Sequence, residues 1–521
     1  TGGMNHLSAR ALAEVPLGGR GSWLVSDRRT YTDVIRSSLY DNIFGTLSAT
    51  ENDDGTIRTG NLSGGAPNAS SETPSFYFYD VNSKATYTPT DRDVVAISLY
   101  AGTDDLDESS LRRLGAQEEA TDTIDITDVT SWGNRGASTR WSRRWSPRVT
   151  TDLLASTSRY FSDSRTGADA GFLSRGFEEE NEVRDVTLRL DNTLLLPTGL
   201  KLGFGVQYTD HRITYDRVDQ QGDSIVGSLD LAGEGALTSG YMEVDRAFFS
   251  RLRITAGTRI SAYEPTGETY TEPRASVRLQ LTDRIALKGA LGRFYQFVKR
   301  VENEDILEGS RDFWVLADKD LPPASSEHVI AGIAYETPSY LLDLEGYNKE
   351  LGGVSQFSVR SRQETGQDLS TAFFSGTGTV RGLEVLAQKK AGRLTGWVSY
   401  ALSEVVHDLE GFNNDEPFPA SHDQRHELKV VGSYRVDDWT LSGSFTYGSG
   451  SPYTIPESQY PLRLLDGSTL NYVHVGEKNA QRLPHYERLD LSASRRFETE
   501  RWFAQVNASL FNVLGSDNVW Y

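Results

Sequence analysis

Cysteine is absent from this chain of 521 residues, and methionine occurs only twice. A chain without cysteine forms no disulfide, no thiolate metal site and no cysteine nucleophile. Long apolar runs are also missing: no segment approaches the roughly 20 consecutive apolar residues of a membrane-spanning helix, and the mean hydropathy is −0.47. These absences exclude a helical membrane protein and the chemistry of reactive thiols.

Positive charge is scarce as well. Lys and Arg number 53 against 73 Asp and Glu, which leaves a formal net charge of −20. Proteins that bind nucleic acids need a basic face to neutralise phosphates, so we expect no nucleic-acid partner. Acidity of this kind affects solubility and the surrounding field, and it does not indicate a fold.

Both ends of the sequence are abrupt. The first residues, Thr1-Gly2-Gly3, lack the basic start and the apolar segment of a secretory signal peptide. The last residues, 518–521, stop inside a strand-like stretch. We therefore interpret the sequence as a fragment that is cut at both ends.

Alternation of apolar and polar residues with a period of two runs along most of the chain. In residues 439–448 the odd positions are mainly apolar: Trp439, Leu441, Gly443, Phe445 and Tyr447. The even positions are small or hydroxylic: Thr440, Ser442, Ser444, Thr446 and Gly448. The same pattern recurs in residues 251–262 and 427–436. A helix would scatter both sets around its circumference, so the pattern predicts two-faced β-strands.

Ten tight turns separate pairs of such strands. They lie at 18–21, 89–92, 146–148, 197–199, 250, 282–284, 337–339, 391–393, 437–438 and 498–500. Between successive turns lie two strands and one longer polar connection, as at 36–75, 103–130, 306–324 and 459–482. Ten hairpins imply about twenty strands.

Short turns at one end and long polar loops at the other are typical of outer-membrane barrels. The predicted fold class is therefore all-β: residues 1–521 form one large antiparallel transmembrane β-barrel, in which closure leaves no unpaired edge. Soluble propeller blades are the main structural alternative. Blades have short strands and a recurring motif, whereas the strands here often run for about 12 to 18 residues and no dipeptide repeats.

Seven stretches, in this order, resemble motifs of TonB-dependent receptors, the energised importers of bacterial outer membranes. They are 14–35 (EVPLGGRGSWLVSDRRTYTDVI), 80–84 (DVNSK), 323–328 (PASSEH), 376–384 (GTGTVRGLE), 419–426 (PASHDQRH), 486–490 (YERLD) and 510–513 (LFNV). One departure is Val15, where the family usually has glycine. The resemblance covers nearly the whole chain, but only the barrel part of the family's plan.

The resemblance implies a barrel of about 22 strands, of which this chain would hold about 20, without the N-terminal plug, the TonB box and the final strand. It implies an integral protein of the bacterial outer membrane that binds a scarce nutrient at its outer loops and imports it with energy from TonB. The nutrient would be a siderophore, a corrinoid, a glycan or a peptide. The implied partners are outer-membrane lipid, the TonB complex acting through the plug, and the nutrient, with a surface lipoprotein as a further candidate. A passive porin-like or structural barrel is the alternative, and an outer-membrane protease or phospholipase is a more distant one.

Four charged residues in or beside these motifs lie on polar strand faces: Glu384, Arg425, Arg488 and Asp490. We expect them to face the lumen, in a network of ion pairs and hydrogen bonds that would contact the plug. A merely solvated wall is the alternative interpretation.

Aromatic residues in and beside the long loops suit stacking on the rings of a sugar or a siderophore. The aromatic girdle of a barrel would account for such residues equally well. The best candidates for substrate binding are Arg311, Phe313, Trp314 and Tyr295.

Motifs of catalysis are missing: the sequence has no HExxH, nucleophile elbow, P-loop or dinucleotide fingerprint. His422 and His426 would lie about 13 Å apart on a strand, too far for one zinc ion unless a bent loop brings them together. Acidic clusters at 104–108, 178–180 and 302–305 lie in or beside the long loops and are interpreted as solvated segments, with Ca²⁺ binding as the alternative. We expect no enzymatic activity and no resident cofactor.

Overall fold

The computed structural model describes residues 1–5, 7–32, 75–113, 123–170, 174–222, 224–303, 312–358, 373–463, 469–500 and 502–518. These residues form a β-structure that is antiparallel apart from one short parallel pairing between residues 302–303 and 356–357, with a single short 3-10 turn at Asn413–Asp415. No helix among them is long and apolar enough to cross a membrane. The predicted all-β class is confirmed.

Twenty strands within the described residues follow one another along the chain, and each pairs in antiparallel fashion with the next. They are β2 (Ser8–Pro16), β3 (Gly21–Thr30), β4 (Ser75–Thr90), β5 (Asp93–Asp107), β7 (Thr123–Ser146), β8 (Val149–Asp169), β9 (Ser174–Leu195), β10 (Lys201–Gln221), β11 (Ser224–Phe248), β12 (Leu252–Tyr263), β13 (Glu268–Gln280), β14 (Ile285–Gln296), β17 (Ala324–Glu336), β18 (Tyr340–Phe357), β19 (Phe373–Lys389), β20 (Leu394–Leu409), β22 (His426–Val436), β23 (Trp439–Gly448), β28 (Tyr486–Glu498) and β29 (Phe503–Leu510). The short β1 (Gly2–Met4) pairs with the outer edge of β2.

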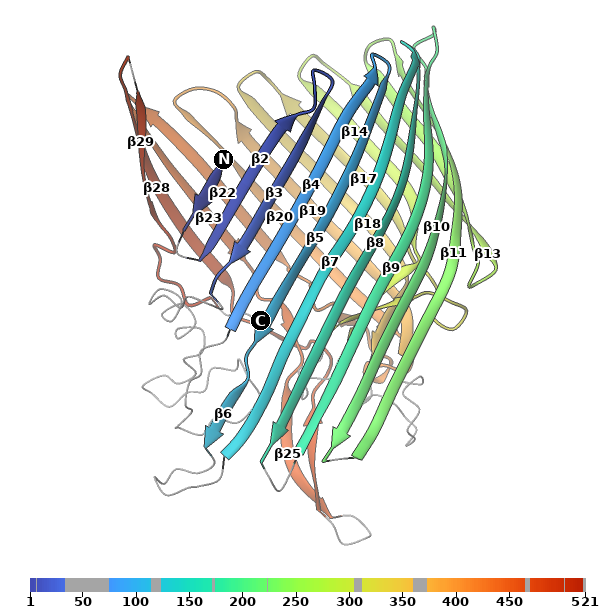
Figure 1. Cartoon of the computed structure of the whole chain (residues 1–521), viewed down its shortest axis with the longest axis vertical. Coiled ribbons are helices and arrows are strands. Elements are labelled where there is room, and N and C mark those ends of the chain that lie inside the picture. Colours follow the sequence, from blue (N-terminus) through green and yellow to red (C-terminus); the bar gives the residue numbers. More distant parts are fainter. Residues whose placement is uncertain are drawn as a thin grey trace.

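The sheet curls around a central space (Figure 1), so that β28 and β29 come round toward β2 and β3. No pairing joins β29 to β1 or β2 within the part of the chain that the structure describes. The curvature is that of a large barrel wall. Closure of the ring and the absence of a plug remain predictions.

The ten short turns lie where the sequence predicts them, all at the upper end in Figure 1. Gly18 (φ 56°) and Gly199 (φ 77°) adopt the left-handed backbone conformation that glycine accepts without strain. At the opposite end not every connection is long, because four residues ending in Gly267 join β12 to β13. Most of the predicted long connection at 36–75 lies outside the described residues.

Strands β7 to β11 are longer than predicted, with 21 to 25 residues each. Beyond the membrane-sized part, the outward side chains of these strands are polar, as in the pair Arg165 Nε to Glu178 Oε1 at 2.7 Å, whereas inward side chains such as Ile213 and Tyr215 are apolar and buried. The apolar face therefore changes from the outside to the inside while pairing continues, and the sequence pattern underestimates the strand length.

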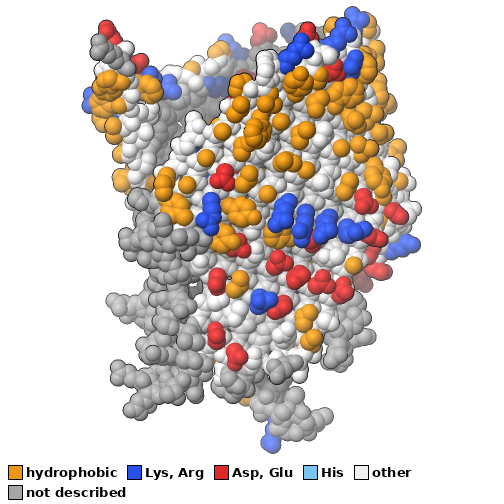
Figure 2. Space-filling view, viewed as in Figure 1, with side chains coloured by type: hydrophobic (Ala, Val, Ile, Leu, Met, Phe, Trp, Pro, Cys, Tyr) orange, Lys and Arg blue, Asp and Glu red, His pale blue; other side chains and the backbone are white. Residues whose placement is uncertain are grey.

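The two faces of the sheet differ in chemistry as predicted. On β9 and β10 the apolar side chains of Leu188 and Val206 point outward and are 53% and 58% exposed. On the other face the hydroxyls of Thr187 and Thr209 lie 3.1 Å apart in a hydrogen bond. Figure 2 shows hydrophobic side chains gathered on the half of the outer surface that is nearer the short turns. Such a surface is stable facing hydrocarbon, while the inner face suits water.

Short strands fill the connections at the lower end in Figure 1. They are β6 (Ser110–Arg113), β15 (Val298–Asn303), β16 (Phe313–Leu316), β21 (Phe418–Pro419), β24 (Pro452–Tyr453), β25 (Pro456–Arg463), β26 (Thr469–Val475) and β27 (Gln481–Arg482). Several of them fold back onto the inner face of the barrel wall and form the structure's main buried clusters.

Candidate functional site

The inner wall carries ion pairs that join neighbouring strands. Lys288 Nζ on β14 lies 2.7 Å from an Asp343 carboxylate oxygen on β18 and also binds Glu345. Glu345 lies directly opposite Glu384 of β19 in the strand register. A hollow of about 410 Å³ opens on this part of the wall, where Asp245, Arg253, Arg278, Lys288 and Glu345 are among its lining residues. The wall thus presents charges of both signs to the central space.

The four charged residues expected in the lumen fall into three separate places. Arg488 and Asp490 lie on the hydroxylic face of β28 and pair with each other at 2.8 Å. Asp490 Oδ1 also accepts a hydrogen bond of 2.9 Å from the backbone N–H of Asn512. Glu384 is opposite Glu345, while Arg425 precedes β22 and binds Glu404 at 2.9 Å. The structure therefore pairs two of them and does not bring the four into one cluster.

A hairpin formed by β15 and β16 folds against the inner face of β9, β10 and β11. Its strands pair from Val298 with Leu316 to Val301 with Phe313. The Asn181 side chain on β9 accepts a hydrogen bond from Trp314 N at 2.7 Å and donates one to Trp314 O at 3.0 Å. Tyr263 Oη donates to the carbonyl of Ala317 at 2.6 Å. These bonds satisfy backbone groups that would otherwise be buried without partners.

Aromatic packing holds the same hairpin to the wall. The rings of Phe313 and Tyr215 stack at 3.9 Å between centroids and 8° between planes. Phe357 and Phe373 meet Phe313 edge to face. The Phe313 side chain is buried and has no free ring face for a ligand in this arrangement. The Phe313 ring contacts only other parts of the protein in this arrangement. It could affect substrate binding only indirectly, by holding the hairpin in place.

The other substrate candidates lie around the hairpin. Trp314 packs against the buried cluster that contains Ile213 and Tyr263. Tyr295, near the end of β14, has its ring 4.8 Å from that of Tyr270. Arg311 lies outside the described residues. Tyr295 and Trp314 therefore remain candidates on one surface, and their role stays a prediction.

Lys299 of β15 is a buried cation that the sequence did not single out. Its ammonium donates to the Pro322 carbonyl at 2.9 Å and to Ser355 Oγ at 2.5 Å. Burial lowers the pKa of this amine to about 8, because removal from water disfavours the charged form. Nothing in the local sequence distinguishes this lysine from a solvated loop residue.

A second cluster joins the connection after β20 to the connection after β23. The Asp423 side chain is 0% exposed, and its Oδ1 accepts a hydrogen bond of 2.7 Å from Val405 N. Arg482 forms an ion pair with this carboxylate and donates to the Asp423 carbonyl at 2.9 Å. Lys478 Nζ lies 3.8 Å from Glu302 Oε1, which ties the cluster to the hairpin. Three connections are thereby linked at the loop end of the barrel.

His407 lies inside this second cluster, close to the loop end of β20. Its ring is buried against Phe418 and lies 6.1 Å from the ring of His422. Burial, and to a lesser degree the neighbouring His422, lower the pKa of His407 to about 4. The imidazole is therefore neutral at physiological pH. His426 belongs to β22, and its Nδ1 lies 2.9 Å from the Tyr400 hydroxyl, whereas the ring of His422 lies beside that of His407.

Two of the acidic clusters lie in strands instead of loops, which corrects their predicted position. Residues 104–107 belong to β5 and residues 178–180 to β9, so that successive carboxylates point to opposite faces of the sheet. Residues 304 and 305 lie outside the described part. Within that part, no three His, Asp or Glu side chains are grouped to hold a metal ion.

Comparisons with known proteins place this wall and its loops in a family. A family model described as "TonB dependent receptor-like, beta-barrel" matches residues 26–513. A comparison with curated protein sequences gives no match.

Solved structures share the fold at low identity. The FpvA structure of P. aeruginosa bound to a ferric pyoverdine superposes with a TM-score of 0.62 at 10% identity, over 98% of this chain and 66% of that one. The ferric citrate transporter FecA gives 0.61 at 13% identity, over 98% and 71%. The copper transporter OprC gives 0.63 at 12% identity, over 98% and 72%.

The chain thus spans 66% to 72% of the length of these three structures. At such identities the structures support the fold alone, whereas the family model covers most of this sequence. The chain belongs to the family of TonB-dependent receptor-like β-barrels.

Proposed function

We propose that the protein containing this chain is an outer-membrane receptor that binds a scarce nutrient at its loop end and imports it through the lumen with energy from TonB. Family membership supports this directly, because the family comprises receptors and transporters and not enzymes. The observation that carries the proposal is the two-faced wall: an apolar outer band and a charged, accessible inner face. Such a wall can hold a gated aqueous route across a membrane.

In this proposal the residues near the loop end contact the nutrient, and the charged residues of the inner wall contact the plug. Tyr295 and Trp314, with Arg311, contact the nutrient near the hairpin of β15 and β16. Glu384 and the Arg488–Asp490 pair face the plug, as do the charged side chains that line the inner hollow. Energy comes through TonB because the sequence carries no nucleotide-binding motif.

The similar structures suggest which classes of nutrient should be tested. The similar structures are named for a ferric pyoverdine complex, ferric citrate and copper. A binding screen of the full-length protein should therefore include ferric siderophores, ferric citrate, copper, corrinoids, glycans and peptides. Deletion of the gene should abolish high-affinity uptake of one of them, and a protonophore should do the same in the parent strain. Unchanged uptake of every compound after deletion would contradict the proposal.

A passive channel is the second candidate, and one observation favours it. The hairpin of β15 and β16 lies on the inner wall, as a constriction loop of a porin would. A passive channel should conduct ions steadily in a planar bilayer when the full-length protein is inserted. The receptor should stay closed under the same conditions, and its uptake should require TonB.

A further inference from the structure

Four arginines form a continuous row on neighbouring strands. Arg135 of β7 lies opposite Arg159 of β8, Arg159 opposite Arg184 of β9, and Arg184 opposite Arg212 of β10. Residues that face each other in this way have Cβ atoms about 5 Å apart, and like charges so placed repel. A row of four guanidinium groups is thus an arrangement that calls for compensating anions.

The row lies on the outer surface, at the limit of the apolar band. Arg184 is two residues from the exposed Val186 on the same face of β9, and Arg212 is four residues from Tyr208 on β10. Figure 2 shows basic side chains lined up across the middle of this surface, between the hydrophobic region and a region of acidic side chains.

The depth of the row agrees with a membrane boundary. Eleven positions separate Arg184 from the turn end of β9 at Leu195. At about 3.3 Å per residue and a tilt of about 45°, that length spans roughly 25 Å, the height of the apolar band of an outer-membrane barrel. The arginines therefore sit at the interface on the loop side.

Carboxylates neutralise only part of the row. Glu182 binds Arg159 Nη2 at 2.5 Å and also binds Arg184, while Glu234 binds Arg212 at 3.0 Å. Arg135 makes no ion pair within the described residues and lies over the ring of Phe161 at 5.7 Å. Two carboxylates thus form ion pairs with three of the four guanidinium groups, and the exposed Asp210, two residues from Arg212 on the same face of β10, is a further acidic side chain beside the row.

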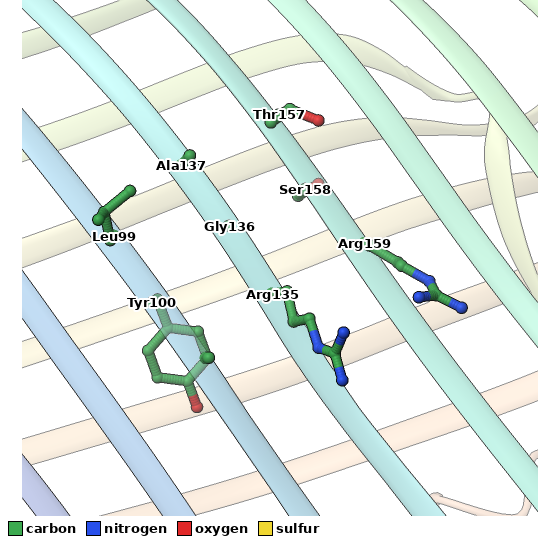
Figure 3. A pocket seen from close by; sticks show the side chains of 9 residues that line it. Leu99, Tyr100, Arg135, Gly136, Ala137, Thr157, Ser158 and Arg159 are labelled. Atoms are coloured by element: carbon green, nitrogen blue, oxygen red, sulfur yellow. The ribbon is translucent and has the colours of Figure 1, made fainter.

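A shallow hollow of about 350 Å³ borders the row, and Figure 3 shows the residues that line it. Leu99, Ala137 and Thr157 lie on the membrane side, and Arg135 and Arg159 lie side by side below them with their guanidinium groups pointing the same way. Apolar contact and positive charge are therefore adjacent on the outer wall.

Acidic side chains bound the row on the loop side. Asp163, Glu180, Asp216 and Asp230 face one another on β8 to β11, about four residues beyond the arginines. Negative groups at that level repel an anion, so an anion on this part of the surface is favoured at the arginine row instead.

We propose that this arginine row, residues 135, 159, 184 and 212, binds the phosphate groups of phosphorylated lipids in the outer leaflet, with acyl chains lying along the hollow and the apolar band. Guanidinium groups bind phosphate oxygens through paired, charge-assisted hydrogen bonds. A lipid can contact both the arginines, through its phosphates, and the apolar band, through its acyl chains, whereas free phosphate could contact only the arginines. The site lies outside the lumen and is independent of the proposed import.

The test uses the full-length protein in detergent and lipid A, a diphosphorylated acylated disaccharide. Native mass spectrometry should detect lipid A on the wild type, and substitution of all four arginines by glutamine should weaken binding at least about tenfold. Replacing them with lysine should restore part of the affinity, because charge is kept. A matched control changes four turn arginines to glutamine, Arg20, Arg92, Arg148 and Arg284, and should leave lipid A binding unchanged.

Two further arms identify the source of the phosphate. Dephosphorylated lipid A should bind the wild type no better than it binds the glutamine variant. Millimolar inorganic phosphate should fail to displace lipid A. Equal binding of lipid A to the wild type and to a folded glutamine variant would overturn the proposal, as would full displacement by inorganic phosphate. Strand content by circular dichroism confirms that the variants are folded.

Discussion

Phe313 anchors a loop hairpin to the inner face of the barrel wall through the packing of its ring. Its ring is enclosed by Tyr215, Phe357 and Phe373, and only 2% of it is exposed. The sequence identifies it as an aromatic residue in a long connection, which fits ligand stacking and structural packing equally. Only the contacts distinguish the two.

Replacing Phe313 with alanine should release the hairpin of β15 and β16. Removal of a buried phenylalanine costs about 3–5 kcal/mol, because it combines lost burial with a cavity. Hydrogen exchange measured by mass spectrometry should show loss of protection in residues 298–303 and 312–316. Phe249→Ala is the matched control, since Phe249 is 93% exposed in a turn and should leave exchange unchanged. Equal protection in Phe313→Ala and wild type would contradict the assigned packing.

His407 makes the second loop cluster sensitive to acid. Its folded pKa of about 4 lies below the ordinary value of about 6.5. Below pH 6.5 the His407 imidazole is protonated when the loop cluster is unpacked, but it stays neutral while it is buried in the packed cluster. Packing of the cluster is therefore less favourable as the pH falls. The resulting loss in the free energy of packing the cluster is absent above about pH 6.5 and reaches roughly 3 kcal/mol below pH 4.

Exchange protection of residues 409–423 should therefore fall between pH 6.5 and 4, after correction for intrinsic rates. His407→Gln has no titrating group and should lose most of this dependence. The charged neighbours of His407 that would remain are His422, Glu302 and Lys478. An identical pH profile in the variant would assign the effect to one of these groups instead.

At the scale of elements, strands and short turns are predictable from the sequence, and the loop hairpins are not. A strand with one apolar and one polar face shows a period of two, and its turns need glycine or polar residues. The hairpin of β15 and β16 has no such pattern, because its partners are side chains on distant strands, such as Tyr263, 54 residues from Ala317, and Asn181, 133 residues from Trp314.

Asn181→Ala should undock this hairpin without disturbing the barrel. The change removes both hydrogen bonds to Trp314 and one to the Thr214 carbonyl. Hydrogen bonds contribute about 1 kcal/mol each, and buried groups left without partners cost more, so exchange in residues 312–316 should rise at least about tenfold. The exposed Asn134 on β7 provides the control Asn134→Ala. No difference between the two variants would show that the aromatic contacts alone hold the hairpin.

At the scale of the whole molecule, successive residues of one strand face two different environments, the apolar surroundings outside the wall and the aqueous space inside it. Leu188 faces outward near the middle of the apolar band, and Thr187 faces the inner space. Leu188→Arg should lower the free energy of unfolding in lipid vesicles by about 2–4 kcal/mol, as for arginine near a bilayer midplane. Thr187→Arg should cost less, because its side chain meets water. A larger loss for Thr187→Arg would reverse the assignment of the two faces.

The sequence by itself determined the all-β class, the ten turns, the approximate number of strands and the two faces of the wall, because each depends on neighbours within a few residues. The tertiary structure decided the packing of Phe313, the burial of Lys299 and His407, and the dispersal of Glu384, Arg425, Arg488 and Asp490. It also decided the arginine row, since strand register places residues 135, 159, 184 and 212 at one level. Register is a relation between strands, and no single strand's sequence contains it.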